Sequence, residues 1–461
     1  MCLHGHVHQL RRAGRRLRRR RAGQDRDDRL TEGGARVTTA NPEDTRPLAG
    51  TAASAGTRST ATSWYTSLRE ALDRPLTAYY LLLGASALLL TIGVIMVLSA
   101  SSVYSYEKND GNSYAVVERQ LMWVAIGLPA AFVASRLSPQ WIRRLAWPGY
   151  FVSLGLLLLT AFIGVTINGN RNWVALGPIV IQPAEIAKLA LILWAAHVYA
   201  HKDRRLGSLH QVLMPVVPGL LLATGLVIFG HDLGTALVLF AILLGMLWVV
   251  GAPARFFVMA ISIVSVVAVF LAAASPERLA RITNFADPFK DFHDTGWQPA
   301  HGLYALSTGG WFGQGIGASQ QKWGDLPEAH TDFIFAVLGE ELGLVGTLLV
   351  IALFLTIAYA AVRIARETAD PFVRYTIFGI VVWLVGQMMI NVGMVLALLP
   401  VIGIPLPLVS YGGSSLVPTL VALGLVIGFA RREPEAARAL AQRRRDRSAG
   451  LSAGKVSGRS L

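Results

Sequence analysis

Residues 324–343 read GDLPEAHTDFIFAVLGEELG, a polar loop that becomes an apolar helix near Asp332. Thr331 or Asp332 is predicted to be the N-cap of that helix, because a short oxygen side chain can accept an orphan backbone N–H there. Glu340 and Glu341 follow about two turns deeper in the helix. A charged residue at the centre of a bilayer costs about 2.5–3.5 kcal/mol on insertion scales, so carboxylates here indicate a function. The stretch is predicted to hold the reacting group of a membrane enzyme.

The composition is that of a membrane protein. Of the 461 residues, 53% are hydrophobic and 15% are charged, and a soluble chain of this length would need more polar surface. Cys2 is the only cysteine, so no disulfide forms within the chain. The net charge of +14 comes largely from the two tails. Neither a Walker glycine loop nor a His/Cys cluster is present, so ATP hydrolysis and a zinc site are not expected.

Apolar runs and short polar breaks alternate from about Leu76 onward. Each run is long enough to cross about 30 Å of hydrocarbon as a helix. We therefore predict an all-α, polytopic membrane domain at 76–432 with about ten transmembrane helices. The predicted spans are 77–103, 118–136, 145–166, 183–200, 211–229, 233–250, 256–275, 332–362, 372–399 and 412–430.

Lysine and arginine in the short loops predict the orientation, because cytoplasmic loops carry an excess of them. The basic loops are those at 136–144, 202–205 and 363–374, and this pattern places both termini in the cytoplasm. Residues 1–75 are predicted to be a disordered basic and polar tail, and 433–461 a second basic tail. The arginine run of the first tail favours an anionic-lipid contact or a topology signal over nucleic-acid binding.

A long outward loop at 276–331 joins the seventh and eighth predicted spans. Long loops are usually functional or disordered. Its content of Trp and Gly, including Trp297, Trp311 and Trp323, favours an ordered lid. The alternative is a mobile loop with its tryptophans at the level of the lipid headgroups.

Two polar sites on the outward side contain cations. Asn170, Arg171 and Trp173 lie in one loop, where the planar guanidinium suits a phosphate; the alternative is a surface turn with a positioning tryptophan. Glu185 and Lys188 are three residues apart, so they share a helix face. They form either a structural buried ion pair or part of an anion site.

Two further outward sites precede predicted helices. Asp232 either caps the helix that follows it or takes part in chemistry. Ser410, Gly412, Gly413 and Ser414 open the last span, where backbone N–H groups and hydroxyls favour an anion; a plain helix cap is the alternative. Glu328 and His330 lie beside Asp332. Together these sites fit an amphiphile with a phosphate headgroup, handled at the outer leaflet.

Five segments in this order resemble the SEDS family (shape, elongation, division and sporulation), and its cell-division branch more than its elongation branch. They are MVLSASSVYSYE (96–107), GNRNW (169–173), QPAEIAK (182–188), LPEAHTDFIFAVLGEELG (326–343) and LPLVSYGGSS (406–415). The resemblance covers about residues 76–432. Two positions depart from it: Asn172 stands where members usually carry arginine, and Gly230-His231 stand where members carry Gln or Glu followed by Pro.

The resemblance implies a peptidoglycan glycosyltransferase that polymerises lipid II. The 4-hydroxyl of an acceptor sugar would attack the anomeric carbon of the donor chain and expel the lipid pyrophosphate. Asp332 would be the general base, and Arg171 and Lys188 would hold the pyrophosphate. A divalent cation, Mg or Mn, can assist by neutralising its charge.

The resemblance also implies partners and a location. A class B penicillin-binding protein, which is a transpeptidase, and other divisome membrane proteins would assemble with the chain. The location would be the bacterial cytoplasmic (inner) membrane at the division septum. The remaining interpretations are a lipid II flippase and a divisome scaffold; the collection of polarity at the outer ends of the spans favours chemistry over transport.

Overall fold

The computed structural model describes most of the chain beyond the first tail. Contacts divide the chain into two units, Met1–Thr62 and Ser63–Leu461, and every described residue belongs to the second. The described residues are 76–167, 170–177, 179–273, 287–290, 292, 296–324, 326–439 and 441–442. The predicted disordered tail at 1–75 and most of the predicted basic tail at 433–461 lie outside them.

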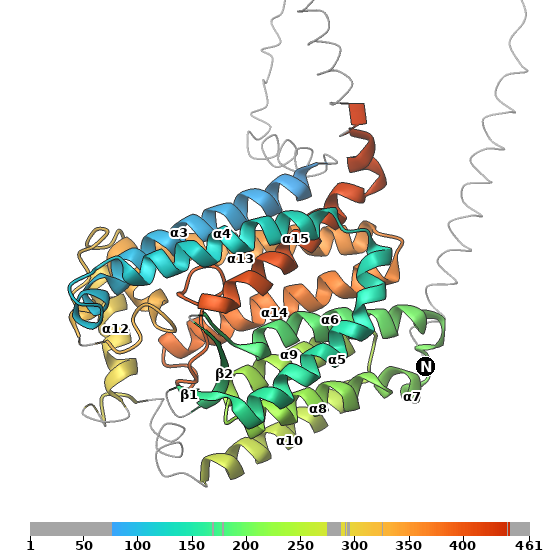
Figure 1. The fold of residues 1–461 in the computed structure, drawn as a ribbon, viewed down its shortest axis with the longest axis horizontal. Coiled ribbons are helices and arrows are strands. Elements are labelled where there is room, and N and C mark those ends of the chain that lie inside the picture. Colours follow the sequence, from blue (N-terminus) through green and yellow to red (C-terminus); the bar gives the residue numbers. More distant parts are fainter. Residues whose placement is uncertain are drawn as a thin grey trace, which may run out of the picture. The chain divides into compact units, whose positions relative to one another are not determined.

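A helix occupies every segment that the sequence predicts to span the membrane. These helices lie side by side with their long axes in similar directions (Figure 1). Within the described residues, 7 helical segments are long and apolar enough to cross a membrane, so the count of ten spans stays a prediction. The helices are α3 (Thr77–Lys108), α4 (Ala115–Arg136), α5 (Pro139–Ile163), α6 (Pro183–His201), α7 (Leu209–Leu213), α8 (Val216–Phe229), α9 (Leu233–Val249), α10 (Ala254–Ala273), α13 (Ile334–Glu367), α14 (Pro371–Val395) and α15 (Leu416–Arg432).

Helices α4 and α15 show how small residues bring two of these helices together. Gly424 and Gly428 lie one turn apart on α15, against the backbone of Ala131 and Ser135 on α4. A Cβ atom at either glycine would overlap that backbone. Lipid tails are as apolar as leucine, so close van der Waals packing, rather than a hydrophobic driving force, holds membrane helices together.

Large apolar side chains cover the outside of the helix bundle. Leu88 on α3, Phe151 on α5 and Phe270 on α10 are each more than half exposed. Apolar patches of this extent are rare on soluble monomers but are what a helix presents to lipid. The outer surface therefore agrees with the composition.

The segment at 166–182, predicted to be a loop, instead contains a small antiparallel sheet. Its strands are β1 (Val165–Ile167), β2 (Asn170–Leu176) and β3 (Ile179–Ile181), in the order β1-β2-β3. β-Branched residues and Trp173 favour extended backbone, and Gly177 takes the left-handed turn before β3 with φ +64°. Figure 1 shows β1 and β2 at one end of the bundle.

Short helices and helix caps complete the described part. Asp370 accepts a hydrogen bond from Phe372 N at the start of α14, and Ser138 accepts one from Trp141 N at the start of α5. These caps satisfy backbone donors that have no partner within the helix. The short helices are η1 (Asp203–Arg205), α12 (Trp297–Gly309), η2 (Gln321–Trp323) and η3 (Gly413–Ser415).

Candidate active site

Asp332 is buried immediately before α13, with 6% of its surface exposed. Its predicted role as N-cap is wrong, and so is that of Thr331: α13 begins at Ile334, its N-cap is Phe333, and no side chain caps it. The reason is a tight turn ahead of the helix, in which Glu328 O accepts hydrogen bonds from Thr331 N at 3.1 Å and Phe333 N at 3.2 Å. Asp332 is therefore not the N-cap residue of α13.

A second carboxylate lies close to Asp332. The Thr331 hydroxyl is 2.6 Å from Glu328 Oε2 and 3.1 Å from Asp332 Oδ1. One hydroxyl carries one proton, so it can donate to only one of these acceptors at a time. Glu328 itself is exposed and has a left-handed backbone conformation, with φ +54°. The structure therefore brings together Glu328 and Asp332, as predicted.

Aromatic rings enclose His330 on the same turn. Its ring centroid is 4.8 Å from that of Tyr104 and 5.8 Å from that of Tyr411, and its carbonyl accepts from Tyr411 N at 2.9 Å. Burial lowers the pKa of His330 from 6.5, and the neighbouring charge of Glu328 opposes this shift. Arg119 hydrogen-bonds to the Tyr411 hydroxyl, so a cation joins this group.

The segment that precedes α15 connects Asp332 with the interior of the bundle. Asn391 Nδ2 on α14 is 2.7 Å from both Asp332 O and Ile404 O. A Cβ atom added to Gly403 would lie 3.9 Å from Asp332 Oδ2, so the Gly403 backbone passes close to this carboxylate. Gln387, one turn from Asn391 on α14, donates to Pro405 O at 2.8 Å. Two amides of α14 therefore hold the 403–405 backbone beside Asp332.

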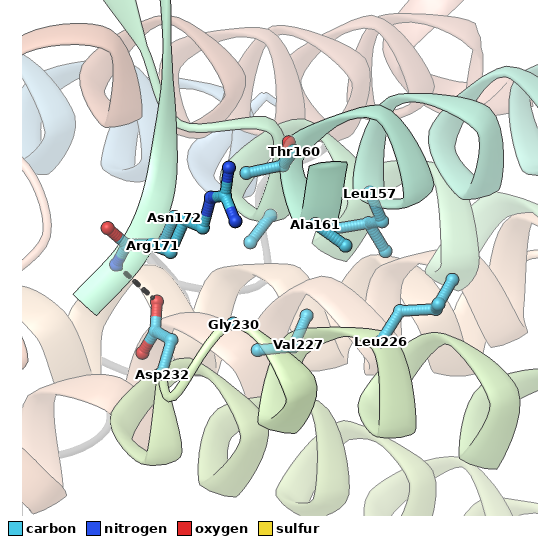
Figure 2. Close-up of a pocket in the computed structure, with 10 residues that line it drawn as sticks. Leu157, Thr160, Ala161, Arg171, Asn172, Leu226, Val227, Gly230 and Asp232 are labelled. Carbon is cyan, nitrogen blue, oxygen red and sulfur yellow. Dashed lines mark hydrogen bonds between the residues drawn. The ribbon is translucent and has the colours of Figure 1, made fainter. Parts of the chain in front are cut away.

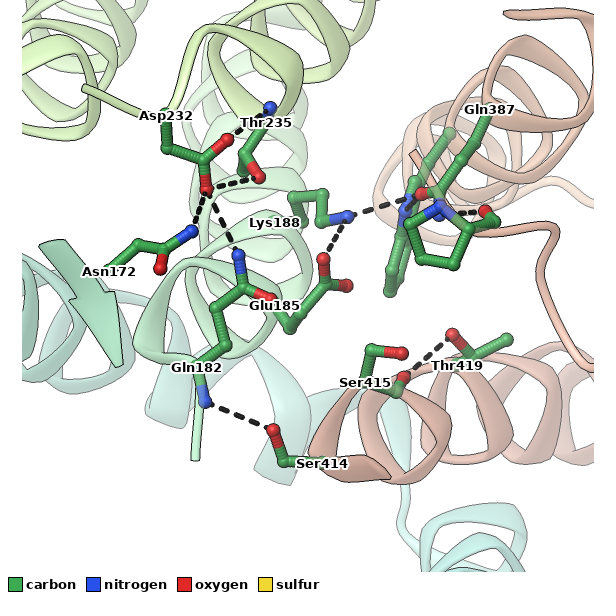
Figure 3. A network of polar contacts seen from close by, with 12 residues as sticks. Asn172, Gln182, Glu185, Lys188, Asp232, Thr235, Gln387, Ser414, Ser415 and Thr419 are labelled. Atoms are coloured by element: carbon green, nitrogen blue, oxygen red, sulfur yellow. Dashed lines mark hydrogen bonds and ion pairs between the residues drawn. The ribbon is translucent and has the colours of Figure 1, made fainter. Parts of the chain in front are cut away.

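Lys188 forms an ion pair inside the bundle. Its Nζ is 2.7 Å from Glu185 Oε1 and 3.1 Å from Gln387 Oε1, and it lies over the Trp383 ring at 5.3 Å from the centroid (Figure 3). Lys188 is 1% exposed and Glu185 is 3% exposed. The predicted pairing is confirmed. Gln387 accepts from the Lys188 ammonium group and donates to Pro405 O, so it links Lys188 to the 403–405 backbone that lies beside Asp332.

Asp232 is the centre of a second network, which joins β2, α6 and α9. Its Oδ2 accepts from Asn172 Nδ2 at 2.8 Å, Gln182 Nε2 at 3.0 Å and Thr235 Oγ1 at 2.8 Å. Its Oδ1 accepts from Thr235 N at 2.9 Å, so the predicted cap of the following helix is confirmed. Figure 3 shows that Gln182 links this carboxylate to Ser414, whose Oγ accepts from Gln182 N at 3.0 Å.

Arg171 lies on β2 beside a small pocket that also includes Asn172, Asp232 and Thr160 (Figure 2). Its Nε donates to Gly164 O at 3.0 Å and its Nη2 to Phe162 O at 2.5 Å. These carbonyls lie at the end of α5, where a cation is favourable. The residue is exposed, and its predicted contact with pyrophosphate stays a prediction.

The other predicted binding residues lie in two places. Asn170 and Trp173 pair with Ile167 and Val165 across the β1–β2 sheet. Ser410 Oγ accepts from Leu406 N at 2.7 Å, so this hydroxyl stabilises the turn before α15. Gly413 has φ +50° at the start of η3, directly after Gly412. That motif opens the last helix, as predicted, although α15 proper starts at Leu416 rather than at 412.

Several residues of this region were missed from the sequence. Tyr104 and Arg119 reach the site from α3 and α4, and Asn391 and Gln387, which the sequence indicates only as hydrogen-bonding contacts between helices, reach it from α14. Lys322 was also missed; it lies in η2 and is 3.4 Å from Glu341 Oε1. A polar side chain inside an apolar span was the available signal for Asn391 and Gln387. Among the described residues, no group of three or more His, Cys, Asp or Glu side chains could hold a metal ion.

Known proteins match the chain over most of its membrane part. A family model described as "Cell cycle protein", which covers FtsW, RodA and SpoVE, matches residues 79–434. A protein named probable peptidoglycan glycosyltransferase FtsW from Mycobacterium tuberculosis is 40% identical over 378 residues, covering 82% of this chain and 72% of that protein. Stage V sporulation protein E of Bacillus subtilis is 38% identical over 356 residues, covering 76% of this chain and 96% of that protein.

Solved structures share the arrangement of the helices. One, described as "Structural coordination of polymerization and crosslinking by a peptidoglycan synthase complex", has a TM-score of 0.63 at 30% identity and covers 77% of this chain and 97% of its own. The rod shape determining protein RodA of Thermus thermophilus has a TM-score of 0.57 at 28% identity, covering 77% of this chain and 97% of its own.

Proposed function

The chain belongs to the cell cycle protein family of FtsW, RodA and SpoVE, and from this premise we propose the reaction that it performs. It is a multi-pass membrane enzyme, a peptidoglycan glycosyltransferase. Its substrate is lipid II, a disaccharide-pentapeptide carried on a lipid pyrophosphate. Its product is the glycan strand of the septal wall, and the relatives named FtsW support this division role.

Asp332 is the general base in this proposal. The observation that carries the assignment is a buried carboxylate that lies outside the helix it precedes and beside the 403–405 backbone. The acceptor 4-hydroxyl gives its proton to Asp332 as its oxygen bonds to the anomeric carbon of the donor. The bond from that carbon to the pyrophosphate oxygen breaks, and the pyrophosphate leaves with the electron pair. A base must come within about 2.6–3.2 Å of the proton-bearing oxygen.

Cations stabilise the leaving pyrophosphate. Arg171 and Lys188 are the proposed ligands, and Arg119 is a further cation at the Asp332 turn. A planar guanidinium binds phosphate oxygens in pairs, whereas an ammonium acts as a point charge. The buried Lys188 is already neutralised by Glu185, so its contribution to the site is polarity rather than a full free charge.

A divalent cation bound to the pyrophosphate would add positive charge. Glu328, which is exposed beside Asp332, offers the hard oxygen ligands that Mg²⁺ or Mn²⁺ prefers, and Asp332 keeps its role as the base. The cation would neutralise the leaving group as the bond to the sugar breaks.

The partner is a class B penicillin-binding protein that crosslinks the new strand. A structural relative is described as a peptidoglycan synthase complex that coordinates polymerization and crosslinking, and this supports the pairing. Other divisome membrane proteins and a septal location follow from the same division role.

The deciding experiment compares wild type with Asp332→Asn in a polymerisation assay on lipid II, using the purified full chain and its penicillin-binding partner. General-base catalysis typically contributes 10²–10⁴-fold, so the variant should lose at least about 100-fold in rate while retaining its thermal unfolding. Asp287→Asn, which changes an exposed aspartate of the outward loop, is the matched control and should keep wild-type activity.

Two outcomes would contradict the proposal. Full polymerisation by Asp332→Asn would remove the carboxylate from the mechanism. Translocation of lipid II by the wild type in liposomes, without polymerisation, would assign the chain to the transporters.

A further inference from the structure

Helix α13 is interrupted at Gly343, which has φ 68° and ψ −166°. In a regular helix, the N–H groups of Leu344 and Val345 would bond to the carbonyls of Glu340 and Glu341. Here Leu344 N donates to Gly310 O at 2.9 Å, and Val345 N donates to Trp311 O at 3.1 Å.

The two displaced carbonyls have partners on the same extracytoplasmic segment. Glu340 O accepts from Gln314 N at 2.9 Å, and Glu341 O accepts from Gly315 N at 3.0 Å. Residues 310–315, which we call the inserted segment, therefore replace the backbone hydrogen bonds of one turn of α13. The first part of α13, residues 334–342, is joined to the rest of the helix through this segment.

Glycine permits this close approach. Gly313 has φ +79°, and a Cβ atom on it would overlap Glu341 O. Gly343 lies opposite, and a Cβ atom there would overlap Gly313 N. Both positions require a residue without a side chain.

A buried group of charged and polar side chains fastens residues 317–322, which follow the inserted segment in the chain, to α13 and α3. Lys322 Nζ is 2.7 Å from Gly317 O, 3.2 Å from Ser99 Oγ and 3.4 Å from Glu341 Oε1. Ser99 Oγ donates to Glu341 Oε1 at 2.5 Å. Lys322 is 7% exposed and Glu341 is 0% exposed. Among the described atoms, Glu341 Oε2 is buried without a hydrogen-bond partner, so the carboxylate depends on its other oxygen.

Glu340 adds a second carboxylate to this group. Its Oε2 accepts from Ser319 Oγ at 2.5 Å and its Oε1 from Gln320 N at 2.9 Å. The group thus holds two carboxylates, Glu340 and Glu341, and one ammonium, Lys322, for a formal charge of −1. Its stability depends on Lys322, because a buried carboxylate without a cation is strongly unfavourable.

We propose that Lys322 and Glu341 are positioning residues for Asp332. The proposal rests on the proposed function, in which Asp332 is the catalytic base. Asp332 directly precedes residues 334–342, and the inserted segment determines where those residues lie relative to the rest of α13. Lys322 and Glu341 fasten residues 317–322, which directly follow the inserted segment and limit where it can lie, so they set the position of the base without contacting the substrate.

Charge-matched variants test this assignment in the purified full chain with its penicillin-binding partner. Lys322→Met lowers the formal charge of the group from −1 to −2, and the double variant Lys322→Met/Glu341→Gln returns it to −1. We expect Lys322→Met to lower kcat at least about tenfold with KM for lipid II changed less than about threefold. Hydrogen exchange in peptides covering 340–346 and 310–316 should speed up about tenfold, with α4 and α15 unchanged. The double variant should recover most of the wild-type kcat and most of the wild-type protection from hydrogen exchange.

A second test variant and a control complete the experiment. Ser99→Ala removes the hydroxyl that contacts both Glu341 Oε1 and Lys322 Nζ and should give the same pattern at smaller size, which keeps the test available if Lys322→Met does not fold. Glu367→Gln changes a carboxylate at the opposite end of α13, paired with Arg363 at 2.9 Å, and should match wild type.

Three results would overturn the proposal. These are a wild-type kcat in Lys322→Met, a lowered kcat with unchanged exchange at 340–346, and faster exchange throughout the molecule. If the wild type does not polymerise lipid II, the proposed function fails, whereas the exchange measurements still decide whether this group holds the inserted segment.

Discussion

At the scale of single residues, the site is built from carboxylates whose surroundings differ. Asp332 lies in a turn where its Oδ1 contacts the hydroxyl of the neighbouring Thr331, whereas Asp232 accepts hydrogen bonds from three residues and caps α9. Asp232 is therefore a structural carboxylate that joins β2, α6 and α9, whereas Asp332 stays the proposed base.

His330 should make the folded state sensitive to acid. Burial lowers its pKa below 6.5, so between 6.5 and the lower folded value the unfolded state binds more protons. Stability should therefore fall as the pH drops below 6.5 and level off beneath the folded pKa. His330→Gln cannot titrate, so its thermal unfolding in detergent should depend less on pH over this window.

The exposed histidine His210 on α7 provides the control for that measurement. His210→Gln should retain the wild-type pH profile of unfolding. An unchanged profile in His330→Gln would show that the buried ring does not contribute to the acid sensitivity.

At the scale of elements, the lysine of an ion pair on α6 also hydrogen-bonds to α14 inside the bundle. Lys188 of α6 contacts Gln387 of α14, and the same glutamine holds the backbone beside the Asp332 site. Buried ion pairs are weak evidence for stability, because desolvation can exceed the attraction, but a broken pair leaves an uncompensated charge. Glu185 therefore serves to balance the charge of Lys188, and the hydrogen bond from Lys188 to Gln387 also fixes α6 against α14.

Lys188→Met should destabilise the protein by about 3–5 kcal/mol, because Glu185 would be left buried without its cation. The double variant Lys188→Met/Glu185→Gln should be considerably more stable than the single variant. Denaturant titration in mixed micelles measures both.

The pair Arg363–Glu367 at the end of α13, in which Glu367 is exposed and Arg363 is partly buried, is the comparison. Arg363→Met should cost only about 0.3–0.5 kcal/mol, as for surface pairs four residues apart. Equal losses of unfolding free energy in Lys188→Met and in the double variant would mean that the unpaired charge of Glu185 does not cause the destabilisation.

At the scale of the whole molecule, β1, β2 and α12 lie at one end of the bundle (Figure 1), and Asn172 of β2 joins the Asp232 network there. The basic loops lie at the other ends of the same helices. The positive-inside rule then assigns the site end to the outside. This orientation suits a substrate whose headgroup is at the outer leaflet.

Cysteine labelling tests the orientation. Cys2→Ser removes the only native cysteine, so single cysteines can be placed at will. In right-side-out vesicles, an impermeant maleimide should label Ile316→Cys, in an exposed part of the outward loop, and should not label Arg204→Cys, in the loop after α6. Labelling of position 204 but not of position 316 would show that the orientation is opposite to the predicted one.

The sequence alone determined the features that depend on neighbouring residues. Apolar runs predicted the helices, because a helix in lipid must satisfy its backbone hydrogen bonds within its own segment. The Glu185–Lys188 pair and the Asp232 cap join residues three apart, so helix geometry was sufficient to predict them. The five motifs, taken in their order along the chain, also indicated the family.

Only the tertiary structure decided how distant segments meet. Asn391 reaches Asp332, Lys322 reaches Ser99 on α3, and residues 310–315 replace a turn of α13. Local patterning also misjudged the start of α13 and the sheet at 165–181, where a tight turn at Glu328 and the hairpins β1–β2 and β2–β3 form instead of the expected cap and loop. The contacts of Asn391, Lys322 and residues 310–315 join residues far apart in the chain and have no period in the sequence, so only packing determines them.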